Sequence, residues 1–336
     1  MTATESAPSR SFVRRRLHSL LGLWIVLFLI EHLLTNSQAA LLIGQNGTGF
    51  IRSVNVLKHL PYLPVIEIVL LGVPILLHGV WGIRFLLTSK SNAYRRGKHT
   101  PHLPEYGRNH AYVWQRISSW ILVVGLIAHV GYMRFHAYPV EVNLGKESYY
   151  SVRVGLDPGL YTVADRLGVE LYDTDRIKRA EEDFRGAEKD LKSMEARVRA
   201  IRERGEAPLS YDSRDADLLK HYRELEDRKA RLNGLTKRTL TEGQVIAEAP
   251  DFGTAMLLVV RNAFRSLFTA ILYTIFVIAA VYHAFNGLWT FMITWGIVLK
   301  MRSQSKAVNR CIGIMIVIGL LGLAAIWGTY FVNLKV

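Results

Sequence analysis

Five long apolar stretches divide the chain. They run over about 17–42, 64–87, 113–135, 267–298 and 311–332. A helix needs roughly 20 apolar residues to cross the hydrocarbon core of a bilayer, which is about 30 Å thick. Half of all residues are apolar, as expected for an integral membrane protein. The sequence therefore predicts an all-α membrane protein with five transmembrane helices.

A long hydrophilic segment, 137–265, separates the third and fourth apolar stretches. Its first part, VEVNLGKESYYSVRVGL, alternates between apolar and polar residues, which indicates short strands. Its centre repeats apolar residues at spacings of three and four, which is the seam of a coiled coil: Ile177, Ala180, Phe184, Ala187, Leu191, Met194, Val198 and Ile201. A Gly-Glu-Ala-Pro break at 205–208 precedes a second helical run. We expect an antiparallel coiled-coil hairpin with arms at about 174–204 and 213–240.

These patterns divide the chain into four parts. We expect a tail over 1–16, three transmembrane helices within 17–136, a soluble insertion over 137–265, and two transmembrane helices within 266–336.

The net charge of +14 lies beside the apolar stretches. Basic residues gather in the N-terminal tail and in the turns near 84–116 and 300–310, whereas the insertion is nearly neutral. This is the positive-inside pattern and not a surface for nucleic acid. It predicts a cytoplasmic N-terminus, with the insertion and the C-terminus on the external, periplasmic side of the membrane.

Four of the five expected membrane helices each carry one central histidine: His32, His78, His129 and His283. The hydrocarbon interior penalises ionisable groups, so such residues are functional-site candidates. With a rise of 1.5 Å per residue, His32 and His129 fall at similar heights in the outer half, and His78 and His283 in the inner half. The sequence therefore predicts two pairs, His32 with His129 and His78 with His283.

Two imidazoles at matched height on facing helices are typical of ligands to one haem, so two pairs favour two b haems in a four-helix bundle. A zinc site needs ligands that converge on one point, and two heights exclude that for all four histidines. Two alternatives stay open: hydrogen bonds between helices, and a proton relay. Relays usually recruit carboxylates as well, and Glu31 and Glu67, both in the outer half, are the only acids within the expected spans. Bis-histidine ligation leaves iron no open position, which favours electron transfer.

The sequence resembles the single-chain, di-haem cytochrome b subunits that anchor succinate:quinone oxidoreductases, of the five-helix type in Bacillus-like and chlamydial complexes. The resemblance rests on five segments in order: RRLHSLLG at 15–22, EHLLTN at 31–36, VPILLHGVWGI at 73–83, QRISSWILVVGLIAH at 115–129 and HAFNGLWTFMITWGI at 283–297. They cover all the expected histidine-bearing helices.

The resemblance implies the same pairing. His78 and His283 would bind the proximal haem, and His32 and His129 the distal haem. It also places four residues near the proximal propionates and the quinone: His18, Ser19, Gln115 and Arg116. For Arg116 a role as a positive-inside anchor is equally consistent.

Glu67 matches an acidic position of Bacillus-like relatives and would exchange protons beside an outer quinone. A water-exposed helix end explains it nearly as well. Two positions depart from relatives: Thr294 replaces a lysine, and Val281 stands where a related fumarate reductase uses a glutamate for proton transfer. The insertion is also far longer than the loop of Bacillus-like members.

The implied protein is a subunit of a succinate dehydrogenase in the bacterial cytoplasmic membrane. Separate flavoprotein and iron–sulfur subunits would oxidise succinate, and this chain would pass electrons to menaquinone or ubiquinone in the lipid bilayer. Succinate chemistry is not expected on this chain, whose single cysteine, Cys311, cannot ligate a cluster. The alternatives are a di-haem anchor of another respiratory oxidoreductase and a haem-free scaffold that presents the hairpin.

Overall fold

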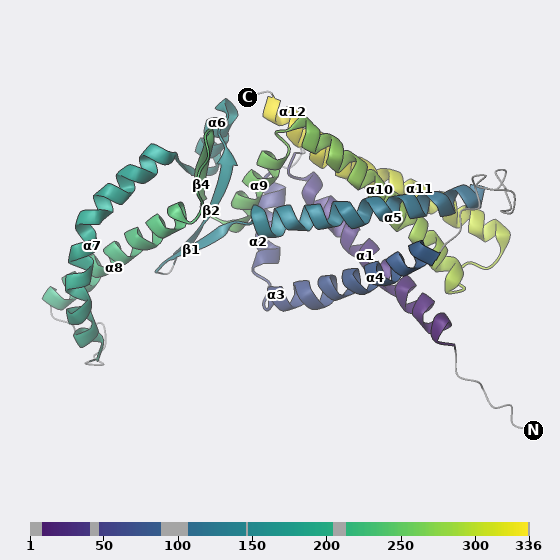
Figure 1. The fold of residues 1–336 in the computed structure, drawn as a ribbon, viewed down its shortest axis with the longest axis horizontal. Coiled ribbons are helices and arrows are strands. Elements are labelled where there is room, and N and C mark those ends of the chain that lie inside the picture. Colours follow the sequence, from purple (N-terminus) through teal and green to yellow (C-terminus); the bar gives the residue numbers. More distant parts are fainter. Residues whose placement is uncertain (1–8, 41–46, 89–106, 146, 204–212, 335–336) are drawn as a thin grey trace, which may run out of the picture. The chain divides into compact units, whose positions relative to one another are not determined.

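The computed structural model describes residues 9–40, 47–88, 107–145, 147–203 and 213–334 (Figure 1). The basic turn expected around Lys90 to Lys98 and the break at 205–208 lie outside these residues. The chain forms two compact units. Unit 1 comprises residues 1–131 and 264–332, and unit 2 comprises 132–263 with the last residues, 333–336.

Unit 1 is built from helices, five of which are long and apolar enough to cross a membrane. The first is α1 (Arg10–Ser37), and the second joins α3 (Leu63–Ile66), the π-helix η2 (Glu67–Gly72) and α4 (Val73–Thr88). The third joins α5 (Gly107–Val130) to the π-helix η3 (Gly131–His136). The fourth is α10 (Leu267–Thr294), and the fifth joins α11 (Met301–Leu323), η5 (Ala324–Gly328) and α12 (Thr329–Leu334). The predicted all-α membrane protein with five spanning helices is confirmed.

Helix α10 lies at the centre of unit 1, where it packs against α1, α5 and α11, and α1 in turn packs against α4. The starts of α1, α5 and α11 and the end of α10 meet at one end of the unit. There, Arg108 donates a 2.7 Å hydrogen bond to Gln304 Oε1, and the Arg16 guanidinium lies 5.1 Å from the Trp295 ring. We call this the basic end. Neighbouring spans therefore run in alternating directions, as the sequence predicts.

Helix α1 begins seven residues before the expected boundary at Leu17 because its first turn is capped. Ser9 Oγ accepts a 3.3 Å hydrogen bond from the Phe12 amide, which satisfies one of the free donors of a helix start. The arginines at 14–16 therefore lie on the helix and extend its charged first turns beyond the apolar stretch.

Pro74 disturbs the second span in a specific way. A proline lacks the amide hydrogen that would bind the carbonyl four residues earlier, here that of Leu70, and its ring crowds that carbonyl. The preceding turns widen into the π-helix η2, and Trp24 Nε1 of α1 donates a 2.5 Å hydrogen bond to the Leu70 oxygen. In a membrane, backbone carbonyls must be satisfied within the protein, so this bond joins α1 to the π-helix η2 of the second span, at the distortion.

Unit 2 contains a four-stranded antiparallel sheet in the order β1-β2-β4-β3. Its strands are β1 (Val140–Leu144), β2 (Glu147–Gly155), β3 (Glu170–Tyr172) and β4 (Gln244–Ala249). The short strands expected near 140–156 are β1 and β2. The sequence pattern does not mark β3 and β4 as strands. They flank the hairpin in sequence but lie side by side in the sheet.

Two helices of unit 2, α6 (Pro158–Leu167) and α9 (Phe252–Ala263), share an apolar core with the sheet. Val152, Leu160, Ala247 and Ala255 are fully buried in this core. The other two helices, α7 (Thr174–Glu203) and α8 (Ser213–Thr236), pack against each other within a few residues of the expected hairpin bounds. Their seam buries Phe184, Leu191, Val198, Ile201, Leu219, Tyr222 and Leu225.

Glu248 of β4 is a carboxylate buried between the sheet and the hairpin. It is 6% exposed, and its Oε1 lies 2.8 Å from Arg231 of α8. Glu170 of β3 stands directly opposite in the register. Burial raises the pKa of Glu248 to about 7, against the opposing effect of Arg231. Tyr149 and Tyr172 pack around the same cluster, and burial raises the pKa of both phenols.

This cluster predicts that unit 2 loses stability as pH rises from about 4.5 to about 7. The folded state holds a proton on Glu248 in that window and the unfolded state does not, so stability falls with increasing pH. The measurement is hydrogen exchange of the β4 amides in the intact chain, at about pH 5 and about pH 8, corrected for the intrinsic rate. Glu248→Gln should flatten the dependence; a slope unchanged in this variant would contradict the assignment.

Candidate functional site

The four membrane histidines come together as two ring pairs inside unit 1. His78 of α4 faces His283 of α10, with ring centroids 6.3 Å apart and planes at 81°. His32 of α1 faces His129 of α5, with centroids 5.9 Å apart and planes at 82°. We call them the basic-end pair and the far-end pair. The structure brings together the two pairs that helix depth predicts, one histidine from each of four helices.

The spacing within each pair fits two imidazoles on opposite sides of one iron ion. Metal–nitrogen bonds of about 2 Å on each side place the centres of such rings about 6.3 Å apart. The measured separations, 5.9 and 6.3 Å, agree with this value. Among the described residues, no group of three or more histidine, cysteine, aspartate or glutamate side chains could hold a metal ion, so the donor set is pairwise.

In the basic-end pair, the Nδ1 atoms of both imidazoles face oxygen atoms of the protein. His78 Nδ1 lies 3.0 Å from the His18 carbonyl oxygen. His283 Nδ1 lies 3.4 Å from Ser118 Oγ and 3.3 Å from Ser119 Oγ. A metal-binding histidine usually donates its second ring N–H to such an acceptor, which fixes the tautomer and the ring orientation. In both residues these contacts leave Nε2 as the ring nitrogen available to a metal ion.

The far-end pair is less symmetric. His129 Nδ1 lies 3.1 Å from Tyr273 Oη of α10. His32 Nδ1 lies 3.5 Å from Nδ2 of Asn36, whose amide also donates a 2.8 Å hydrogen bond to the His32 carbonyl. An amide nitrogen is a donor and does not accept the proton of Nδ1. His129 thus has an oxygen acceptor of the kind seen in the basic-end pair, and His32 faces a donor.

Two glycines leave space beside the pairs. A Cβ at Gly22 of α1 would lie 3.0 Å from His78 Cε1. A Cβ at Gly125 of α5 would clash with the ring of Phe276, which packs 5.9 Å from that of His129. Small residues allow close approach of membrane helices, and at these two positions the close approach places a neighbouring helix against a ring of the site.

His18, expected near the proximal propionates, stacks on His78 with ring centroids 4.0 Å apart. Its Nε2 is buried and has no hydrogen-bond partner among the described residues. Buried polar atoms are normally satisfied, so this nitrogen fits a polar group of a bound cofactor or quinone. Ser19, the next residue of α1, is half-buried at the same end.

Gln115 joins two helices of the site. Its amide donates a 3.1 Å hydrogen bond to the His283 carbonyl and accepts a 2.8 Å hydrogen bond from Asn286 Nδ2. Both ends of the Gln115 side chain are therefore engaged by α10. The Arg116 guanidinium lies 5.8 Å from the ring of Tyr112, one turn earlier on α5. Their proposed places near the propionates stay predictions.

Glu67 begins the π-helix η2 and is half-buried. It lies toward the end of the second span that is opposite to the basic end, where an outer proton or quinone site was expected. That role stays a prediction.

The sequence pattern does not single out the residues whose side chains contact the Nδ1 atoms: Asn36, Ser118, Ser119 and Tyr273. The available signal was the one that singled out the histidines, namely a polar side chain within an apolar helix. Sequence alone does not tell which of many such hydroxyl groups faces an imidazole on another helix.

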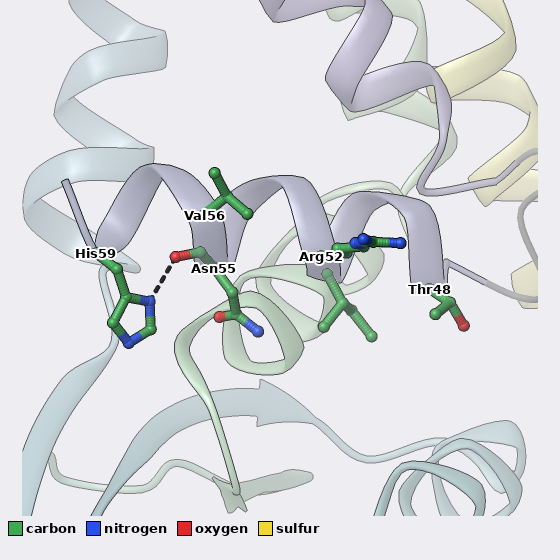
Figure 2. A pocket seen from close by; sticks show the side chains of 6 residues that line it. Thr48, Arg52, Asn55, Val56 and His59 are labelled. Carbon is green, nitrogen blue, oxygen red and sulfur yellow. Dashed lines mark hydrogen bonds between the residues drawn. The ribbon is translucent and has the colours of Figure 1, made fainter.

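A separate hollow of about 620 Å³ lies along α2 (Thr48–Lys58), the helix that follows the first span and precedes the second in the sequence. Figure 2 shows its lining side chains along this helix, where the His59 ring is 2.6 Å from the Asn55 carbonyl. None of the expected site residues lines it.

Comparison with curated proteins finds a similar chain, the succinate dehydrogenase cytochrome b558 subunit of Bacillus subtilis (strain 168). The two are 34% identical over 137 residues, which is 40% of this chain and 62% of the relative. The match thus spans less than two thirds of the relative's length. No protein-family model and no solved structure matches the chain.

Proposed function

We propose that this chain is the membrane-anchor cytochrome b subunit of a succinate:quinone oxidoreductase. The observation that carries the proposal is the geometry of the two histidine pairs, at 5.9 and 6.3 Å, inside a bundle of membrane-spanning helices. The similarity to a succinate dehydrogenase cytochrome b558 subunit supports the same function and favours the succinate family over other respiratory oxidoreductases.

In this proposal His78 and His283 hold one haem b and His32 and His129 hold the other. Each haem supplies a one-electron couple when bound. The chain would provide two imidazole ligands per iron and bury each pair among apolar helices. The ligands and the apolar surroundings would then tune the redox potential of each haem.

The basic end is the proposed docking face for the iron–sulfur subunit and lies on the cytoplasmic side. Arg16, Arg108 and Lys300 gather there, in agreement with the positive-inside rule. Electrons would enter near the basic-end pair and reach quinone, menaquinone or ubiquinone, within the membrane. Succinate oxidation itself would belong to the flavoprotein subunit.

The test is purification of the intact chain with its natural partners, followed by a reduced-minus-oxidised optical spectrum and haem quantification. Two b haems per chain, with flavoprotein and iron–sulfur subunits identified by mass spectrometry, are the expected result. Two haems with a different partner would assign the chain to another respiratory oxidoreductase. Well-folded but colourless protein would refute the haem sites and leave a scaffold role.

A further inference from the structure

Tyr273 occupies a defined place against the far-end pair. Its hydroxyl lies 3.1 Å from His129 Nδ1, and its ring meets the His129 ring edge-on at 5.7 Å and 73°. It comes from α10, whereas His129 belongs to α5, so the contact joins two helices of unit 1.

Aromatic rings hold this tyrosine in position. Phe264 packs edge-on against it at 5.1 Å, and Phe276 at 6.2 Å. Phe276 also packs against His129, in space that the absent side chain of Gly125 leaves open. The hydroxyl is therefore presented to the imidazole by a packed cluster and not by a single rotatable contact.

The chemistry of the contact follows from the tautomer. If Nε2 binds a metal, a neutral imidazole carries its proton on Nδ1, and that N–H donates to Tyr273 Oη. Such a bond raises the basicity of the ligand and so stabilises oxidised over reduced iron. His32 faces the amide nitrogen of Asn36 at 3.5 Å, so the far-end pair has its clear oxygen acceptor on the His129 side.

We propose that Tyr273 is a positioning residue that orients His129 and lowers the redox potential of the far-end haem. This inference rests on the proposed function, because it requires a haem at that pair. Tyr273 contacts His129, the proposed iron ligand, and not the haem itself.

The test compares Tyr273→Phe with Tyr282→Phe in the purified complex. Tyr282 lies on the same helix and donates a 3.3 Å hydrogen bond to the Ala111 carbonyl, away from His129. Both substitutions remove one hydroxyl and keep the ring. Potentiometric titration of the optical spectrum measures the midpoint potential of each haem. The same pair of variants in a His283→Ala background identifies which haem is at the far end.

For Tyr273→Phe we expect two haems per chain and a raised potential at the far-end haem only. The ratio of reduced to oxidised haem at a fixed ambient potential should rise by up to about tenfold, which is about 59 mV for a one-electron couple. Tyr282→Phe should match the wild type. A far-end potential in Tyr273→Phe equal to that of Tyr282→Phe, with both haems retained, overturns the inference and leaves the proposed function intact. Absence of haem in the wild type overturns the proposed function instead.

Discussion

Alanine substitution of both histidines of one pair should leave one haem per chain, whereas substitution of one histidine from each pair should leave none. The first variant is His78→Ala/His283→Ala, and the second is His78→Ala/His129→Ala. Both remove two imidazoles from the same set of four helices. Only their distribution between the pairs differs, so the comparison measures the pairing itself.

The physical reason is the pairwise donor set. Each iron would depend on two imidazoles whose rings lie 5.9 or 6.3 Å apart. Alanine offers no replacement ligand, and among the described residues no group of three or more metal-binding side chains is arranged to hold an ion. Losing one ligand should therefore release that haem from the purified chain, while the other pair, on its own facing helices, keeps its haem.

His59→Ala is the matched control, since His59 lies on α2 and its Nδ1 contacts the Asn55 carbonyl rather than another imidazole. It should retain two haems. Haem is quantified per polypeptide, and circular dichroism checks that the helices remain folded. Equal haem content in the two double variants would exclude the pairing proposed here, even if the wild type binds two haems.

The histidine pairs could be predicted from the sequence because two simple rules act together. Apolar stretches fix the spans, and a constant rise per residue fixes the depth of each histidine along its span. Alternating direction then places His32 level with His129, and His78 level with His283. The structure shows the same partners without any shift of register.

What could not be predicted depends on contacts between distant segments. Pro74 predicts a disturbed helix, but not that Trp24 of another helix binds the carbonyl of Leu70. The short strand β3 has three residues, too few for an alternating pattern, and becomes a strand only because β4 pairs with it. Tyr273 is one of several hydroxyl side chains in α10, and only packing against α5 selects it as the partner of His129.

The second large effect is expected in unit 2, where Asp157→Ala should destabilise the fold by about 3–5 kcal/mol. Arg261 of α9 is 7% exposed and makes two hydrogen bonds to the Asp157 carboxylate, at 2.9 and 2.7 Å. Removing the carboxylate leaves the buried guanidinium without its counter-charge. Asp157 also caps α6 through a 3.0 Å bond from the Leu160 amide, worth about 1 kcal/mol more.

Two further variants separate these contributions. Asp157→Asn keeps a side-chain oxygen for the cap but removes the charge, so it should lose less stability than Asp157→Ala. Asp251→Ala removes the side chain whose Oδ1 accepts a 2.9 Å bond from the Thr254 amide near the start of α9, and should cost about 1 kcal/mol.

Pulse proteolysis of the intact chain in urea measures the effect, with cleavage mapped to residues 132–263. Because the slope of stability against urea is about 1–3 kcal/mol per molar, the midpoint for Asp157→Ala should fall by at least about 1 M. A fall no larger than that of Asp251→Ala would mean that the ion pair adds nothing beyond the cap. In that case the apolar core around α9, rather than the buried charge pair, would fix the position of this helix on the sheet.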